Sequence, residues 1–324
     1  MKAVLCKSWG PPESLTLEEI TSPSPGKGQV VISVKACGVN FPDTLIIEGK
    51  YQFKPEFPFS PGGEVAGVVK EVGEGVKHLK VGMPVFCLTG WGGFAEEVVA
   101  DAKVTFPAPP QMDFVTASAI TMTYGTSYHA LKDRARIKEG ETLLVLGAAG
   151  GVGLAAVQLG ALMGAKVIAA ASTDEKLAFC RENGAQETIN YRTEDLKSRL
   201  KELTNGKGVD VVYDPVGGAY SEIGVRAMGW NGRYLVVGFA AGEIPSIPLN
   251  LPLLKGCQIM GVFWGKFAQT FPQDNMANFM QLLQWFQQGD LKPHIYKTYS
   301  LAQAAAALKD ITDRKVMGKV VLVP

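Results

Sequence analysis

The sequence predicts a two-domain α/β protein in which a partly closed β-barrel carries an inserted domain with a doubly wound parallel sheet. The length of 324 residues exceeds what one core supports, so two domains are expected. Residues 1–122 are rich in short β-branched runs cut by Gly and Pro, whereas strands alternate with helix-length segments from residue 123 onward. The last segment returns to an isolated helix and a closing strand. The predicted division is therefore 1–122 plus 263–324 for the barrel and 123–262 for the inserted domain.

The barrel elements follow from short apolar runs at both ends of the chain. Each run is β-branched and bounded by turn-forming residues, which is typical of strands. The predicted strands near the N-terminus are Gln29–Lys35, Gly63–Val72 and Gly82–Cys87. Near the C-terminus, Leu301–Lys309 predicts a helix and Lys319–Val323 the closing strand.

The elements of the inserted domain alternate in type. An order of strand, helix and strand requires βαβ crossovers and hence a parallel sheet. Helices are predicted over Gly151–Gly164 and Asp174–Asn183, and the uncharged run Ile259–Phe263 is expected at the sheet edge. The predicted inner strands are Thr142–Leu146, Lys166–Ala171, Val209–Tyr213 and Gly232–Val237.

Composition excludes several classes of function. The 32 basic residues nearly balance 31 acidic ones, giving a net charge of +1, so neither nucleic acid nor an anionic membrane surface is an expected partner. The most apolar stretch, Leu154–Ala171, contains Gln158 and Lys166 and predicts a buried helix and strand, with no membrane span. Five cysteines without a C-x-x-C pair and an N-terminus unlike a signal peptide predict a cytoplasmic protein.

A Gly-rich loop follows the first predicted strand of the inserted domain. Residues 143–154 read LLVLGAAGGVGL. Small residues at this spacing permit a tight turn, close approach of a pyrophosphate to the backbone, and packing of the helix on its strand. The βαβ context predicts a dinucleotide site, and a purely structural turn is the alternative. The candidate phosphate-binding residues are Ala148, Gly150, Gly151, Val152 and Gly153.

The end of the second strand favours NADP(H) over NAD(H). An NAD site should place an acid about 20 residues after the loop to hold the ribose 2′-hydroxyl. Here the strand ends in Ala171 and Ser172, with no acid. Ser172 can hydrogen-bond a 2′-phosphate, and Lys176 lies one helical turn further on, where its ammonium can reach the same group. The alternative is that Lys176 is a solvated helix residue.

Four motifs in register resemble the medium-chain dehydrogenase/reductase superfamily, and specifically its zinc-independent NADPH:quinone oxidoreductase branch. They are Gly38–Asp43, Pro61–Val69, the Gly-rich loop and Gly318–Leu322. The resemblance covers essentially the whole chain. It implies a GroES-like domain carrying an inserted Rossmann domain, which is the organisation predicted above.

The resemblance also implies that no catalytic metal is bound. Zinc alcohol dehydrogenases of the superfamily place Cys where Asn40 stands and His where Gly63 stands, and neither Asn nor Gly replaces those ligands. The four-Cys structural lobe is also missing, since Val85–Glu97 contains only Cys87. The histidines stand isolated in the sequence, at His78, His129 and His294.

Further site residues are implied by the resemblance. Asn40 lies near the nicotinamide ribose and substrate pocket, Tyr51 is a candidate proton donor or pocket wall, and Lys319 reaches the phosphates. Tyr191 stacks near the adenine end, and core packing is the alternative for Tyr191 and Phe239. The other residues expected at the cofactor are Thr123, Thr126, Gly238, Phe239 and Phe263.

The implied activity is hydride transfer from NADPH to a quinone. A quinone is a strong hydride acceptor whose product water can protonate, so positioning beside the nicotinamide is sufficient catalysis. One alternative is reduction of an enoyl thioester or another activated alkene, in which Tyr51 protonates carbon. A non-catalytic NADPH-binding protein is a third hypothesis.

A homodimer is expected through the edge of the Rossmann sheet. Ile259–Phe263 carries no charge, and an apolar sheet edge invites pairing with a second chain. Relatives in the resembled family join their sheets in this way. The alternative is that a loop or the C-terminal segment covers the strand within one subunit.

Overall fold

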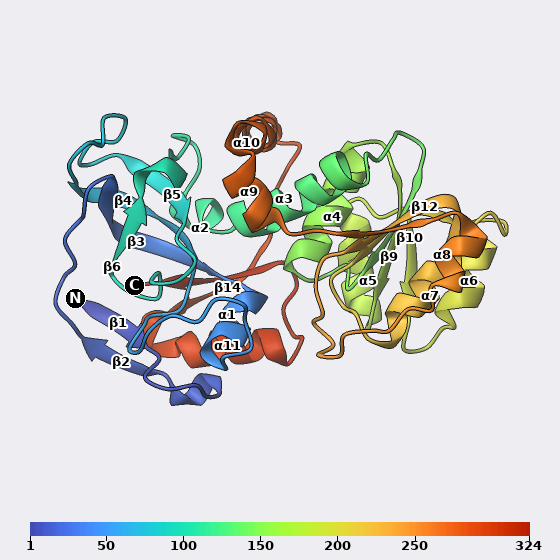
Figure 1. Ribbon diagram of the computed structural model, residues 1–324, viewed down its shortest axis with the longest axis horizontal. Coiled ribbons are helices and arrows are strands. Elements are labelled where there is room, and N and C mark those ends of the chain that lie inside the picture. The colour runs from blue at the N-terminus through green and yellow to red at the C-terminus, as the bar shows by residue number, and fades with distance from the viewer. The chain divides into compact units, whose positions relative to one another are not determined.

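The computed structural model describes residues 1–324 and divides the chain into two compact units. Unit 1 consists of residues 1–122 and 293–324, and unit 2 consists of residues 123–292 (Figure 1). The predicted division therefore requires a correction at its second boundary, because residues 263–292 belong to unit 2. They do not return to the barrel.

The reason for the correction is helix packing. Residues 263–292 form two helices that pack within unit 2, and the indole of Trp264 lies so close to Gly125 that an added Cβ would approach its ring to 2.8 Å. Trp264 also donates from Nε1 to Asn275 Oδ1 at 2.9 Å. The elements concerned are α3 (Thr121–Tyr128), the π-helical turn η3 (His129–Arg134), α9 (Trp264–Thr270) and α10 (Pro272–Gln288).

Unit 1 is built around a seven-stranded sheet that curls about one long strand, β3 (Gln29–Val39). One edge of β3 pairs with β4 (Glu64–Val72), and its other edge is shared by β6 (Glu97–Asp101) and β15 (Lys319–Val323), all antiparallel. Because β6 and β15 share one edge of β3, the sheet curls into a partly closed barrel. In Figure 1 the red C-terminal segment reaches the blue strands of this unit, because β15 completes the sheet.

The remaining elements of unit 1 surround this sheet. Its order is β14-β15-β3-β4-β5-β7, and β1 pairs with β2 in a separate antiparallel ribbon. Apolar side chains from the strands and from two helices, α1 (Phe41–Ile47) and α11 (Ala304–Thr312), form the core. The other elements are β1 (Lys2–Leu5), η1 (Pro12–Ser14), β2 (Thr16–Glu19), β5 (Pro84–Leu88), η2 (Ala102–Val104), β7 (Thr105–Pro107), α2 (Phe114–Ala117), β14 (Ile295–Ser300) and η4 (Leu301–Gln303).

Unit 2 contains a six-stranded parallel sheet in the order β10-β9-β8-β11-β12-β13. The chain order reverses between β8 and β11, so the sheet has a topological switch point there. β13 lies at the edge, as predicted, and pairs only with β12. The strands are β8 (Thr142–Leu146), β9 (Lys166–Ala171), β10 (Glu187–Asn190), β11 (Val209–Asp214), β12 (Met228–Val236) and β13 (Gln258–Gly261).

Helices cover both faces of this sheet, which explains its continuously apolar strands. On one face Gly160 of α4 packs on Leu143, where an added Cβ would come within 2.6 Å of the side chain. On the other face Leu144 shares a core with Leu200 and Val225. The helices are α4 (Gly151–Leu162), α5 (Asp174–Glu182), α6 (Leu196–Leu203), α7 (Ala219–Ala227) and α8 (Asn250–Lys255).

The apolar stretch predicted as a buried helix and strand forms α4 and β9. No helix in the structure is long and apolar enough to cross a bilayer. All five cysteines are free thiols; four are buried and Cys257 is half-buried. The buried four are Cys6, Cys37, Cys87 and Cys180.

Candidate functional site

The strands of unit 2 place the predicted cofactor residues along one edge of the sheet. Gly-rich residues follow β8, Ser172 follows β9, and Tyr191 follows β10. Gly238 and Phe239 follow β12, and Phe263 follows β13. Because the strands are parallel, all these positions lie at the carboxyl edge, where open α/β sheets bind ligands beside the switch point.

The Gly-rich loop has a backbone that excludes side chains at one position and leaves space at another. Gly147 has a φ of 59°, and its carbonyl accepts the N–H of Gly150 at 3.1 Å. An added Cβ at Gly153 would lie 2.3 Å from the Gly147 oxygen, so only Gly lets α4 pack against the loop. An added Cβ at Gly150 would meet nothing closer than 3.5 Å. The loop is therefore closely packed at Gly153 and has free space at Gly150.

The beginning of α4 offers backbone donors to a ligand. Its N-cap is Gly150, which has no side chain to cap the first-turn N–H groups. Such N–H groups, together with the helix dipole, attract anions. Ala148 and Val152 lie on either side of this turn, and the Ala148 N–H is used by the Ala170 carbonyl at 3.1 Å. The arrangement fits a pyrophosphate held by main chain.

Helix α3 is fastened to α4 by two hydroxyl contacts that sequence reasoning missed. Ser127 Oγ donates to the Val152 carbonyl at 2.9 Å and lies 2.8 Å from the Tyr213 hydroxyl. Tyr124 donates to Gln158 Oε1 at 2.8 Å. No local pattern signals these contacts, because each joins residues at least 25 positions apart.

The predicted threonines lie on the same helix α3. Thr123 is buried and Thr126 is half-buried. Burial raises the pKa of Tyr124, so its hydroxyl remains a protonated donor. The helix that carries the two threonines therefore has a fixed position relative to the Gly-rich loop within unit 2.

The end of β9 holds no carboxylate of its own. Ala171 is buried, Ser172 is half-buried, and Thr173 caps α5 by accepting the Lys176 backbone N–H at 3.3 Å. The nearest acid in the sequence, Asp174, accepts the Asn190 side-chain amide at 2.7 Å. Its charge is thereby directed toward the end of β10. Ser172 directly follows β9, and Lys176 lies in the first turn of α5.

The aromatic candidates pack on neighbours in unit 2 and stay partly accessible. The rings of Tyr191 and Tyr220 lie 4.6 Å apart, and Phe239 lies against Gly217, where an added Cβ would come within 2.9 Å of its ring. Phe263 is 52% exposed. Packing contacts and partial exposure occur together at Tyr191 and Phe239, so the two interpretations of these residues are compatible.

Asp214 organises the loop beside the switch point and was also missed. Its Oδ1 accepts the backbone N–H groups of Val216 at 2.7 Å and Gly217 at 2.9 Å. Its Oδ2 accepts the hydroxyls of Ser221 at 2.8 Å and of Tyr234. This carboxylate fixes the turn between β11 and α7, immediately next to the Gly-rich loop on the adjacent strand β8.

A buried ion pair lies at the centre of unit 1. Lys319 Nζ donates to Glu64 Oε2 at 2.9 Å, to Asn40 Oδ1 at 2.6 Å and to the Val39 carbonyl at 3.2 Å. Asn40 Nδ2 donates to the same Glu64 oxygen at 2.9 Å, and Glu64 Oε1 accepts the Met122 N–H at 2.8 Å. The Lys319 and Glu64 side chains are 4% and 0% exposed.

This cluster gives Lys319 a different role from the phosphate contact that the resemblance implies. All three of its N–H bonds have acceptors within unit 1, so no donor remains for a phosphate in this arrangement. Both polar atoms of the Asn40 amide are also engaged, since Nδ2 donates to Glu64 and Oδ1 accepts from Lys319. In the structure Asn40 and Lys319 hold each other and Glu64 in place.

Asp43 and Tyr51 extend the polar region of unit 1. Asp43 Oδ2 accepts the Asn40 backbone N–H at 2.7 Å. Burial raises the pKa of Asp43 to about 7; the Glu64 charge acts in the same direction, while the Asn40 N–H and Lys319 oppose it. Burial, and then the Asp43 charge, raise the pKa of the Tyr51 phenol. Tyr51 is therefore a protonated donor at neutral pH.

Positions 40 and 63, where the resembled zinc enzymes carry Cys and His, hold a hydrogen-bonded amide and a closely packed glycine. Asn40 is engaged as described, and an added Cβ at Gly63 would lie 2.7 Å from the Gly90 carbonyl oxygen, so no side chain fits there. No group of three or more His, Cys, Asp or Glu side chains in the structure could hold a metal ion. His129 Nδ1 instead lies 2.9 Å from Asp133 Oδ2.

Comparison with known proteins shows the family. Residues 26–110 match the alcohol dehydrogenase GroES-like domain, and residues 151–285 match the zinc-binding dehydrogenase family. A quinone oxidoreductase-like protein 2 homolog from Nematostella vectensis is 42% identical over 325 residues, covering 99% of this chain and 88% of that protein. The chain belongs to the quinone oxidoreductase family of medium-chain dehydrogenases/reductases.

Other family members are similar over their full length. Quinone oxidoreductase from Rattus norvegicus is 36% identical over 326 residues, covering 99% of this chain and 97% of that protein. The crystal structure of Escherichia coli quinone oxidoreductase complexed with NADPH has a TM-score of 0.93 and 31% identity, with 100% of both chains covered. The predicted combination of a GroES-like and a Rossmann domain is confirmed.

Proposed function

We propose that this quinone oxidoreductase family member transfers a hydride from NADPH to a quinone without a metal ion. The observation that carries the proposal is the carboxyl edge of unit 2. There an uncapped helix start behind a Gly-rich turn adjoins a strand end that offers Ser172 and Lys176 and no acid. That combination fits a dinucleotide with a 2′-phosphate.

Different residues of unit 2 would contact different parts of the cofactor. The main chain of Gly150–Gly153 would hold the pyrophosphate, and Ser172 with Lys176 would hold the 2′-phosphate. Tyr191 directly follows the neighbouring strand β10, where it would pack at the adenine end. Bound NADPH supplies the hydride. Asp214 keeps the adjacent turn rigid, so that the loops need little ordering when the cofactor binds.

The choice of a quinone as the proposed acceptor is supported by the way unit 1 uses its buried cation. Simple carbonyl reduction needs a Lewis acid or strong donor at the developing alkoxide, and Lys319, the buried cation, is saturated by Asn40 and Glu64. A quinone needs less help, because its reduced form is stabilised by aromaticity and water protonates it. Tyr51 then serves as a pocket wall, and in enoyl reduction it would be the proton donor.

Cofactor preference tests the first part of the proposal. Lys176→Ala should weaken NADPH by about 1.5 to 3 kcal/mol and leave NADH nearly unchanged, because only NADPH carries the phosphate that the ammonium meets. Fluorescence titration of both cofactors measures the difference. Lys166→Ala is the matched control, since Lys166 begins β9 at the opposite edge of the sheet. Equal dissociation constants for NADPH and NADH in the unmodified protein would contradict the assignment.

Acceptor preference tests the second part. Stopped-flow mixing of the NADPH complex with 1,4-naphthoquinone should oxidise the cofactor faster than mixing with crotonyl-CoA. Tyr51→Phe should leave quinone reduction nearly unchanged, because water protonates the product. Fast oxidation by crotonyl-CoA that Tyr51→Phe abolishes would favour the enoyl-reductase alternative. NADPH binding without turnover of either acceptor would favour the non-catalytic alternative.

The metal-free part has its own test. Protein purified without added metal should contain no stoichiometric zinc, and a chelator should leave its activity unchanged. Stoichiometric zinc together with chelator-sensitive activity would overturn this part of the proposal.

The five free thiols support the accompanying proposal of a reducing, cytoplasmic location.

A homodimer through β13 belongs to the same proposal. The outer edge of β13 pairs with no strand, and large apolar side chains are exposed on and beside it. They include Leu253, Leu254, Ile259 and Phe263. An uncovered apolar edge of this kind favours pairing with a second copy. Sedimentation at low micromolar concentration should show about twice 34.7 kDa, and Ile259→Lys should shift the protein to monomer.

A further inference from the structure

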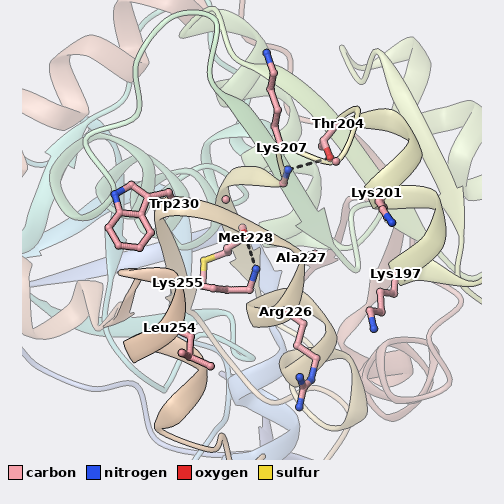
Figure 2. Close-up of a pocket in the computed structure, with 13 residues that line it drawn as sticks. Lys197, Lys201, Thr204, Lys207, Arg226, Ala227, Met228, Trp230, Leu254 and Lys255 are labelled. Atoms are coloured by element: carbon pink, nitrogen blue, oxygen red, sulfur yellow. Dashed lines mark hydrogen bonds between the residues drawn. The ribbon is translucent and has the colours of Figure 1, made fainter.

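A pocket at the amino edge of the unit 2 sheet has no part in the proposed hydride transfer. It lies where α6, α7 and α8 end and where β11 and β12 begin, at the opposite end of the strands from the Gly-rich loop (Figure 2). Its volume is about 350 Å³, which is in the range of small-molecule sites. The pocket could therefore hold a ligand while the carboxyl edge holds another.

The lining of this pocket is strongly cationic. Five basic residues line it and no acidic one does, in a chain whose net charge is only +1. Like charges gathered around a concave surface raise its positive potential and favour an anion. The basic residues are Lys197, Lys201, Lys207, Arg226 and Lys255.

Two of these cations are explained by the fold itself. Arg226 stands in the last turn of α7 and pairs with Glu222 at 2.6 Å. Lys255 stands in the last turn of α8 and donates to the Met228 carbonyl at 2.8 Å, as Figure 2 shows. Cations at helix C-termini are ordinary, because they complement the helix dipole.

Of the three remaining lysines, Lys197 and Lys207 are not explained in this way. Lys197 lies in the first turn of α6, where the dipole disfavours a cation, and Lys207 lies in the loop before β11. Lys201 stands in the last turn of α6, but none of the three forms an ion pair. Glu202 pairs with Arg199, and Asp195 caps the Ser198 N–H at 2.8 Å. The hydrogen bonds with Ser198, and to a smaller extent the Lys197 charge, lower the pKa of Asp195.

Backbone and an aromatic ring complete the pocket. An added Cβ at Gly208 would lie 2.5 Å from the Gly229 nitrogen, so no side chain can fill this part of the lining. Trp230 is 72% exposed, and one face of its indole covers Gly256, where an added Cβ would come within 3.0 Å. Trp230 is itself part of the pocket lining. A flat ring next to a cationic pocket suits a phosphorylated ligand that carries a base.

We propose that this pocket binds a small polyphosphate anion, either free or as the phosphate chain of a nucleotide whose base stacks on Trp230. Three unpaired ammonium groups match the charge of two or three phosphates, and lysine binds phosphate as a point charge. The cations are confined to one concavity and form no extended stripe, so a small ligand fits better than a nucleic acid strand.

Calorimetry with saturating NADP⁺ tests the proposal while the cofactor site is filled. Tripolyphosphate and ATP should both bind the unmodified protein, and Lys201→Ala/Lys207→Ala should weaken both by about 100-fold, because two charge-assisted contacts are lost. Lys77→Ala/Lys80→Ala removes two exposed lysines from unit 1 and is the matched control, with no expected effect. NADPH binding should be the same in both variants, which separates this pocket from the proposed function.

Trp230→Ala separates the two sources of phosphate. If it weakens ATP but not tripolyphosphate, the ligand is a nucleotide; if it weakens neither, the phosphate chain alone is recognised. Sedimentation of this variant controls for assembly, because Trp230 lies against Gly256 at the end of α8. The proposal fails if neither anion binds saturably, if both double variants bind alike, or if a single-stranded oligonucleotide is preferred to both anions.

Discussion

The polar centre of unit 1 and the Gly-rich loop of unit 2 are built on opposite principles. In unit 1, Asn40, Glu64 and Lys319 bury charged and polar side chains whose hydrogen bonds are satisfied by one another. In unit 2, Gly147, Gly150 and Gly153 form the proposed main-chain site, and the loop geometry depends on the absence of side chains at these positions. We therefore expect the unit 1 cluster to be disrupted by substitutions that remove a side-chain partner. The unit 2 loop should be disrupted by substitutions that add a side chain.

The largest effect is expected from removing one partner of the buried pair. Lys319→Met leaves the Glu64 carboxylate buried without its cation and should lower the unfolding free energy by about 3 to 5 kcal/mol. Urea denaturation measures the loss. Lys27→Met is the control, since the exposed Lys27–Glu74 pair is worth at most about 1 kcal/mol. Lys319→Met/Glu64→Gln should recover part of the loss, and a double variant no better than the single one would contradict the ion-pair explanation.

Adding one methyl group to the loop should produce the next largest effect. Gly153→Ala places a Cβ against the Gly147 carbonyl and should cost about 1 to 3 kcal/mol of unfolding free energy. Gly150→Ala is the matched variant, because its Cβ has room, and it should cost less than about 1 kcal/mol. It should nevertheless weaken NADPH, since the methyl group fills the space proposed for the pyrophosphate. Equal stability losses in the two variants would contradict the loop geometry.

A third effect is a pH dependence of stability, which is measured as a slope and not as a single loss. The pKa of Asp43 rises on folding from 3.8 to about 7, so the folded protein binds a proton that the unfolded chain releases. Stability from this group is present below about pH 4 and is lost as pH rises to about 7, with a slope of up to about 1.4 kcal/mol per pH unit. Asp43→Asn should remove that slope from urea denaturation measured across the range. The exposed-carboxylate variant Glu74→Gln should retain it.

The loop could be predicted from sequence because its determinants are local. The strand, turn and helix occupy consecutive residues, and the bounds predicted for β8, β9 and β15 are those observed. The unit 1 cluster could not be predicted, since Lys319 lies 255 positions from Glu64 and 279 from Asn40. Only the pairing of β3 with both β4 and β15 brings these residues together.

The place of helix α10 in unit 2 and the clustering of lysines at the amino-edge pocket could not be predicted from sequence, for the same reason. The contact of Trp264 with Gly125 that places residues 263–292 in unit 2 is tertiary, and no turn signal before α10 announces it. The pocket lysines come from α6 and the loop that follows it, where each looks like an ordinary surface residue. The local sequence pattern thus predicted the geometry of the Gly-rich loop, while long-range pairing determines the side-chain clusters.

The burial of the cysteines protects the protein from its own proposed substrate. Quinones alkylate thiolates, and the thiolate is the reactive form of cysteine. Burial raises the pKa of all five thiols, to about 12 for Cys87 and Cys180, so they remain protonated at neutral pH. After incubation with excess 1,4-naphthoquinone, mass spectrometry should find adducts at half-buried Cys257 first. An enzyme with such thiols can turn over an electrophile repeatedly without being inactivated by it.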